Sequence, residues 1–320
     1  MFLTPEVFIN IFVDFLILIF CFFAFIIAIR IVLYFDFTKD TPLQYSLQSQ
    51  SYLAQTVVKF AFFLKIPLIF YFIYTLDKLS NIIPGAMCAA GVVTANEYGV
   101  YLLALKIINI YLFGIWLLIN SEDLKTKDYK FTKLKFKMFI IFFILLFVEF
   151  VLEILYFNGI DVSKIVSCCG VLFNPVKTSP ISLILKIPHQ YIVFLFYITF
   201  ILILLFGYLK RAFVFSVLNI FFLFISILAI IVFFSPYIYE LPTHRCPFCI
   251  LQKEYFYIGY IIYANLFLGT FFGISQGVLK FFLKKEKNFY NKSLFFNFLF
   301  VIIVTSYVIV YFIKNGVWLF

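Results

Sequence analysis

The sequence predicts an all-α, polytopic integral membrane protein with about eight transmembrane helices in a single membrane domain, residues 1–320. Of its 320 residues, 65% are hydrophobic and only 12% are charged, whereas soluble domains carry about 25% charged residues. The mean hydropathy is +1.10, and the apolar residues form long runs. A soluble enzyme, a nucleic-acid-binding domain, a disordered chain and a secreted disulfide scaffold are therefore excluded, because no water-facing globule of this size could bury so much apolar surface.

Eight apolar stretches reach the length of about 20 residues that a bilayer core requires, so each is expected to form one helix. The expected spans are 7–34, 56–75, 99–119, 138–157, 187–208, 212–235, 250–274 and 294–313. The first stretch is too long for a cleavable signal peptide, and Glu6 stands where a basic leader would be. It is therefore expected to remain as a helix.

The loop lysines predict the orientation of the chain. Most of the loop lysines and arginines fall in the connections 36–55, 120–137, 209–211 and 275–293. The positive-inside rule places these connections in the cytoplasm, so both termini are expected outside, N-out and C-out. The net charge of +10 then reflects the orientation of the chain in the membrane. The lysines within 125–137 and 280–292 are expected to contact anionic lipid headgroups. The expected partner is the lipid bilayer of a bacterial inner membrane, with no nucleic acid and no nucleotide.

The cysteines gather on the face predicted to lie outside. One of the six, Cys21, lies within the first span and is expected as a small buried apolar residue. The other five lie in the connections 76–98, 158–186 and 236–249, as Cys88, Cys168, Cys169, Cys246 and Cys249. Such a face is typical of a compartment where disulfides form, such as the periplasm. Similar stretches follow Cys88 and Cys168, which favours an internal repeat of helix pairs with cysteine loops.

The motif that points to chemistry is Cys246-Pro-Phe-Cys249. Its spacing suits either an internal disulfide or two ligands of one metal. Because Pro247 fits the first turn of a helix, the motif is expected to open the seventh helix from the outside, where the helix N-terminus favours a thiolate. Lys253 follows Cys249 by four residues and is expected on the same helical stripe as both sulfurs.

The segment Cys246-Pro-Phe-Cys-Ile-Leu-Gln-Lys253 resembles the motif of the disulfide-bond formation protein B (DsbB) family of quinone-linked thiol oxidases. In that family a Cys-x-x-Cys is followed by two apolar residues, Gln or Glu, and Arg. The resemblance implies that Cys246 and Cys249 are a redox pair coupled to ubiquinone or menaquinone, which Lys253 and Gln252 would contact. It also implies a four-helix bundle that holds the quinone. The related vitamin K epoxide reductase family places its loop cysteines before the Cys-x-x-Cys, as this chain does.

In this interpretation the remaining cysteines would carry electrons toward the quinone-coupled pair. Cys88 with Cys168 or Cys169 would form an outer disulfide that takes electrons from a periplasmic thioredoxin-like thiol protein. Each transfer would be the attack of a thiolate on a disulfide sulfur. The expected function is thus a membrane thiol–disulfide oxidoreductase that couples exoplasmic cysteine oxidation to a lipid quinone.

Two alternatives stay open for the same residues. The loop cysteines and His244 could bind a soft metal such as Cu(I) or zinc. The expected oxidoreductase function, in contrast, involves no metal ligand. The protein could instead be a transporter whose cysteines form structural disulfides.

Two carboxylates inside the fourth span support the transporter alternative. Glu149 and Glu153 are four residues apart and so share one helix face. Intramembrane carboxylates usually face a cavity or a paired cation, and Lys65 and Lys106 are candidate partners. The pattern predicts either a structural ion pair or a proton path, to which His189 could contribute.

Overall fold

The computed structural model describes residues 4–36, 41–125, 131–166, 188–283 and 288–320, and every regular element in these ranges is helical. Eight of the described helices are long and apolar enough to cross a membrane, which confirms the predicted fold class. Large apolar side chains on them, such as Phe63 and Phe213, are well exposed. Since so much apolar surface is unfavourable in water, the chain is a multi-pass membrane protein in contact with lipid. The N-out/C-out orientation stays a prediction.

The chain divides into two compact units, which are described separately. Unit 1 comprises Met1–Lys78 and Val93–Val162, and unit 2 comprises Leu79–Val92 and Ser163–Phe320. The single membrane domain and the internal repeat that the sequence suggests stay predictions.

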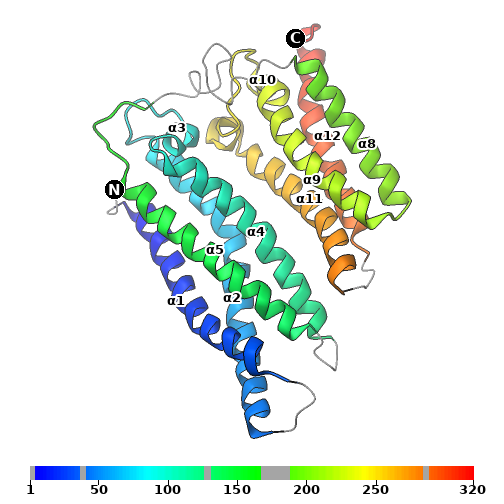
Figure 1. The fold of residues 1–320 in the computed structure, drawn as a ribbon. Helices are drawn as coiled ribbons and strands as arrows, with labels where there is room; N and C mark the ends of the chain where they lie inside the picture. Colours follow the sequence, from blue (N-terminus) through cyan, green and yellow to red (C-terminus); the bar gives the residue numbers. More distant parts are fainter. Residues whose placement is uncertain (1–3, 37–40, 126–130, 167–187, 284–287) are drawn as a thin grey trace. The chain divides into compact units, whose positions relative to one another are not determined.

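The long helices of unit 1 run side by side in Figure 1 and are α1 (Pro5–Tyr34), α2 (Pro42–Leu79), α4 (Tyr98–Asp123) and α5 (Thr132–Asn158). Pro5 occupies the first turn of α1, where its missing N–H costs no hydrogen bond. Gly159 ends α5, and its N–H donates to the carbonyl of Leu155 at 2.9 Å. The helices are thus bounded by residues that suit helix ends.

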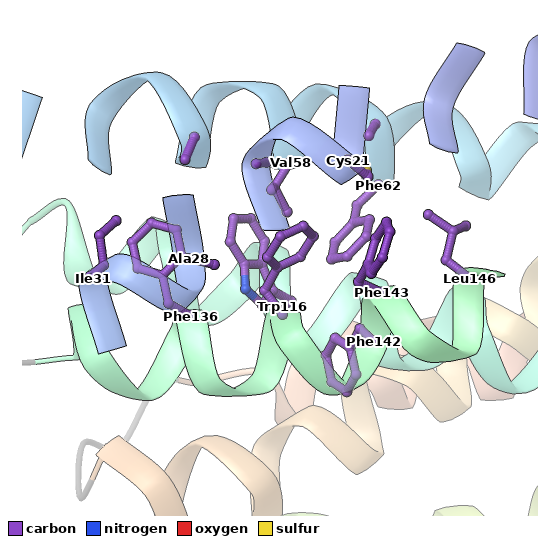
Figure 2. Packing of buried hydrophobic residues seen from close by; sticks show 14 of the residues in the cluster. Cys21, Ala28, Ile31, Val58, Phe62, Trp116, Phe136, Phe142, Phe143 and Leu146 are labelled. Carbon is purple, nitrogen blue, oxygen red and sulfur yellow. The ribbon is translucent and has the colours of Figure 1, made fainter. Parts of the chain in front are cut away.

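Aromatic rings and small residues fill the core of unit 1 (Figure 2). Phe62 of α2 stacks on Phe113 of α4 with ring centroids 4.1 Å apart and meets the edge of Trp116 at 5.4 Å. Such pairs contribute about 0.5–1.5 kcal/mol beyond the burial of their area. On α1 the core residues include Cys21, which is fully buried as predicted. This packing joins all four helices and fixes the positions of the charged residues that they carry.

Unit 2 contains four spanning segments around a second core. They are α8 (His189–Tyr208), α9 with α10 (Ala212–Ala229 and Ser235–Tyr239), α11 (Ile258–Leu283) and α12 (Tyr290–Asn315). One π-helical turn, Ile230–Phe234, joins α9 to α10. Each segment packs on the next, α8 on α9, α9 on α11, α11 on α12 and α12 on α8. The described helices of unit 2 therefore form a closed four-helix bundle (Figure 1).

Three glycines spaced four residues apart let the helices of unit 2 approach closely. Gly269, Gly273 and Gly277 lie on one stripe of α11. A Cβ at Gly269 would collide with Asn297 of α12, and a Cβ at Gly273 would collide with Asn219 of α9. Small residues at this spacing are typical of membrane helix interfaces.

We expect Gly273→Ala to lower the free energy of unfolding by about 1–3 kcal/mol, the usual cost of overpacking. Asn219 has little freedom to move, because its Oδ1 accepts a hydrogen bond from Asn297 Nδ2 at 2.9 Å. The thermal unfolding midpoint of the purified protein measures the effect. Gly207→Ala is the matched control, since its Cβ would meet the methyl groups of Leu294 and the ring of Phe215 only at 3.1 Å, whereas the Cβ at Gly273 would lie 2.1 Å from Asn219. Equal losses in the two variants would contradict this account.

All the predicted spans overlap observed helices, but the predicted start of the seventh span was wrong. It was expected from residue 250, whereas α11 begins at Ile258. Phe256 and Tyr257 have φ of 53° and 55°, a left-handed conformation through which an α-helix does not continue. The apolar character of Ile250 and Leu251 extended the hydropathy signal across a segment that is not α-helical.

Candidate functional site

Three of the predicted cysteines meet in unit 2. Cys88 Sγ lies 3.5 Å from Cys246 Sγ, and the sulfurs of Cys88, Cys246 and Cys249 all lie within 4.8 Å of one another. All three side chains are buried. Because a disulfide has an S–S distance of about 2.05 Å, Cys88 and Cys246 are in contact without being bonded. We call these three residues the cysteine cluster.

The Cys-x-x-Cys lies in the connection between α10 and α11, so the expectation that it opens a helix was wrong. Cys249–Leu251 forms a single 3₁₀ turn. Two tyrosine hydroxyls hold the backbone of this connection. The Tyr239 hydroxyl donates to the carbonyl of Cys246, and the Tyr263 hydroxyl donates to that of Pro247 at 2.6 Å. The motif is thus positioned by side-chain hydrogen bonds, and Cys246 does not open an α-helix.

Lys253 and Gln252 do not lie on a helix that continues from the Cys-x-x-Cys, as had been expected. Since the motif is not helical, Lys253 does not share a helical stripe with the sulfurs. It begins a second 3₁₀ turn, Lys253–Tyr255, and is exposed. The Gln252 side chain donates to the carbonyl of Met87 at 3.1 Å. Gln252 therefore ties the Cys-x-x-Cys connection to the segment that carries Cys88.

A turn precedes Cys88 and positions its segment. Gly85 has a φ of +85°, which a glycine adopts without strain, and a Cβ there would collide with the carbonyl oxygen of Val166. The N–H of Val166 donates to the carbonyl of Pro84 at 3.0 Å. The turn is thus joined to the segment that leads to Cys168 and Cys169, which themselves lie outside the described residues.

His244 stands beside the cysteine cluster. Its ring packs edge-on against Tyr239 with centroids 4.3 Å apart, and it is close enough to Cys88 for their charges to interact. Burial lowers the pKa of His244, and the neighbouring Cys88 acts in the opposite direction. Among the described residues nothing forms a hydrogen bond with its buried Nε2. A neutral imidazole nitrogen of this kind can accept a proton or bind a metal.

Apolar side chains are exposed on the segments that carry the cysteines. Met87, next to Cys88, is 70% exposed, and Phe256 is 91% exposed. Phe256 and Tyr257 also hold the left-handed backbone that is uncommon for bulky residues. Unusual backbone conformations of this kind concentrate at functional sites. These segments therefore offer apolar contact surface at the site.

The second candidate site is a set of five buried charged side chains in unit 1, which we call the charge cluster. Its members are Asp14 (α1), Lys65 (α2), Lys106 (α4), and Glu149 and Glu153 (α5). Lys65 Nζ lies 2.8 Å from Asp14 Oδ2 and 2.7 Å from Glu149 Oε1. Lys106 Nζ lies 3.1 Å from Asp14 Oδ2, 3.0 Å from Glu149 Oε1 and 2.8 Å from Glu153 Oε2.

The charge cluster confirms the predicted ion pairs and adds one residue that the sequence analysis missed. Lys65 and Lys106 are the partners expected for Glu149 and Glu153. Asp14 was not singled out, although it is the acidic residue within the first predicted span and the argument applied to Glu149 applies equally to it.

His189 belongs to unit 2, whereas the charge cluster belongs to unit 1. It begins α8, and its ring stacks on Phe233 with centroids 6.2 Å apart. Its contribution to a proton path stays a prediction.

Comparison of the chain with protein-family models, with curated proteins and with solved structures finds no match.

Proposed function

We propose that the protein is a membrane thiol–disulfide oxidoreductase whose active site is the cysteine cluster. The observation that carries this proposal is the contact between Cys88 Sγ and Cys246 Sγ at 3.5 Å, with Cys249 in the same cluster. Within one chain, a Cys-x-x-Cys disulfide exchanges only if a further thiol reaches it. A third sulfur in contact with it supplies the nucleophile that disulfide exchange requires.

The exchange step conserves atoms and electrons. The Cys88 thiolate attacks Cys246 Sγ of a Cys246–Cys249 disulfide, the Cys88–Cys246 bond forms, and Cys249 leaves as a thiolate. The attacking and attacked sulfurs must close from 3.5 Å to about 2.05 Å. His244, whose ring packs on Tyr239, would take the thiol proton that the attack requires.

Net oxidation of the cysteines also requires a two-electron acceptor, for which we propose a lipid quinone, ubiquinone or menaquinone. Re-forming the Cys246–Cys249 disulfide releases two electrons and two protons, both of which a quinone accepts on becoming a quinol. The exposed Met87 and Phe256 would give its ring apolar contact, and the exposed Lys253 would face its oxygen. The four-helix bundle of unit 2 supports the proposal, since the resemblance implies such a bundle.

Electrons would enter from a soluble thiol. A thioredoxin-like dithiol protein would reduce an outer disulfide between Cys88 and Cys168 or Cys169, and Cys88 would then act as the nucleophile. The hydrogen bond between Val166 and Pro84 supports this pairing, because it ties the chain just before Cys168 to the turn before Cys88.

A variant that lacks the leaving thiol tests the exchange. In a triple variant, Cys249→Ser with Cys168→Ser and Cys169→Ser, we expect mild oxidation of membranes to produce a Cys88–Cys246 disulfide, because no other loop thiol remains to resolve it or to pair with Cys88. Mass spectrometry of peptides from thiol-blocked protein detects the linked pair. The matched control Cys21→Ser removes a buried thiol of unit 1 and should change nothing. If the folded triple variant yields no Cys88–Cys246 peptide, the proposal is wrong.

A metal site is the second candidate function, favoured by the three buried sulfurs of the cysteine cluster, which lie within 4.8 Å of one another. His244 lies outside that group and would have to approach the sulfurs to serve as a fourth ligand. Three cysteines and one histidine are a common ligand set for structural zinc. Metal analysis of the same preparations separates the two candidates. One equivalent of zinc or copper that is lost in His244→Ala and protects the thiols from oxidation would favour the metal site, and metal-free protein that forms the disulfide would favour exchange.

A further inference from the structure

The charge cluster of unit 1 contains one more acid than base. Asp14, Glu149 and Glu153 face only Lys65 and Lys106, and no third cation of the described residues forms an ion pair with them. With all five groups ionised, one negative charge would be buried within membrane-spanning helices. An uncompensated charge in such surroundings is expensive, so one further positive charge would stabilise the cluster.

Glu153 is the carboxylate with the fewest partners. Its Oε2 accepts a hydrogen bond from Lys106 at 2.8 Å, whereas its Oε1 has no partner among the described residues, although the side chain is fully buried. Glu149, in contrast, accepts hydrogen bonds from both lysines and from Asn109. One carboxylate oxygen of Glu153 and one of Asp14 lie within 4.8 Å of each other. A proton on this pair would satisfy an oxygen that otherwise lacks a donor.

A proton suits the space better than a larger cation. The two ammonium groups already contact Asp14 Oδ2 and Glu149 Oε1, where a metal ion would have to bind. A cavity of about 10 Å³ adjoins the cluster, lined by Lys65, Lys106, Asn109 and Glu149, which is room for about one water. Asn109 is fully buried, and its Oδ1 has no partner among the described residues, so it would accept a hydrogen bond from that water.

We propose that the charge cluster is a proton-binding site that holds one exchangeable proton on the Glu153–Asp14 carboxyl pair. The ionisable groups that face the pair are Lys65 from α2, Lys106 from α4 and Glu149 from α5. The Cys21 thiol of α1 lies near Lys65. The water-sized cavity does not touch the pair itself. Lys106 connects the two, because it lines the cavity and donates to both Asp14 and Glu153. The inference is independent of the cysteine chemistry, which belongs to unit 2.

Infrared spectroscopy counts protonated carboxyl groups through their C=O stretching band and its shift in D₂O. We expect one such group in the wild-type protein at neutral pH. Charge counting predicts none in Glu153→Gln, since two acids then face two lysines, and two in Lys65→Met, since three acids then face one. A wild-type protein without the band, or a band unchanged in Glu153→Gln, would overturn the proposal.

A second buried pair in unit 1 provides the matched control. Asp123 and Lys135 lie 2.7 Å apart, both almost fully buried, and Lys135 Nζ also donates to Gln55 at 2.6 Å. Lys135 was expected among lipid headgroups, but α5 begins at Thr132 and turns it inward. Because this pair has one acid and one base, Asp123→Asn should leave the band unchanged; its loss there would contradict the assignment.

One further variant keeps the test valid if Lys65→Met does not fold. The double variant Lys65→Met/Glu153→Gln leaves two acids, Asp14 and Glu149, facing Lys106, and charge counting predicts one protonated carboxyl group. Thermal unfolding of each preparation confirms that it is folded. A double variant without a protonated carboxyl group would overturn the proposal. It would show that the number of protonated carboxyl groups does not follow the balance of acids and lysines in the charge cluster.

Discussion

Replacing Lys106 with methionine is expected to lower the free energy of unfolding by about 3–5 kcal/mol, the cost of breaking a buried ion pair from one side. Lys106 Nζ donates to Asp14, Glu149 and Glu153, so its loss leaves three buried carboxylates with fewer donors. Methionine keeps the apolar volume of the side chain, which confines the effect to the charge. Equilibrium unfolding of the purified protein in mixed micelles measures the loss.

An exposed ion pair gives the reference for this effect. Lys314 and Glu240 lie 2.7 Å apart with side chains that are 59% and 48% exposed, and such pairs contribute about 0–1 kcal/mol. Lys314→Met should therefore change the free energy of unfolding little. Adding Glu153→Gln to Lys106→Met should restore part of the lost stability, because it removes an unpaired acid. Similar losses in Lys106→Met and Lys314→Met would contradict the role assigned to the charge cluster.

Cys246→Ser is expected to reduce the oxidation of a reduced thioredoxin-like protein to the background rate. Cys246 takes part in both disulfides of the proposed exchange, with Cys249 and with Cys88, so neither can form without it. Cys88→Ser should keep the Cys246–Cys249 disulfide but lose the transfer of electrons from the partner. The assay follows thiol loss in the partner in the presence of membranes, with Cys21→Ser as the control. Full activity in Cys246→Ser would contradict the mechanism.

The helices of this protein could be predicted well because a bilayer imposes their length and composition. The expected spans overlap the observed helices even where α2 begins earlier, at Pro42. The start of the seventh helix was missed because hydropathy carries no information on backbone conformation, and the left-handed Phe256 and Tyr257 interrupt an apolar run. The close packing at Gly273 was also missed, although the four-residue spacing of glycines on α11 is a recognisable signal.

The site could be predicted in part. Spacing and composition identified Cys246 and Cys249, and the expense of intramembrane charge identified Glu149 and Glu153. The contact between Cys88 and Cys246 joins segments 158 residues apart, and no local pattern could reveal it. The same limit applies to the hydrogen bond from Gln252 to Met87, which depends on tertiary structure.

The most direct test of the central claim is the thiol state of Cys246 and Cys249 in membranes whose quinone pool is set oxidised or reduced. Alkylation followed by mass spectrometry reads both residues in the same sample. We predict that both are protected as a disulfide when the pool is oxidised, and that both are alkylated when the pool is reduced and a thiol partner supplies electrons. If both residues are alkylated to the same extent in the two states, the protein is not a quinone-coupled thiol oxidoreductase.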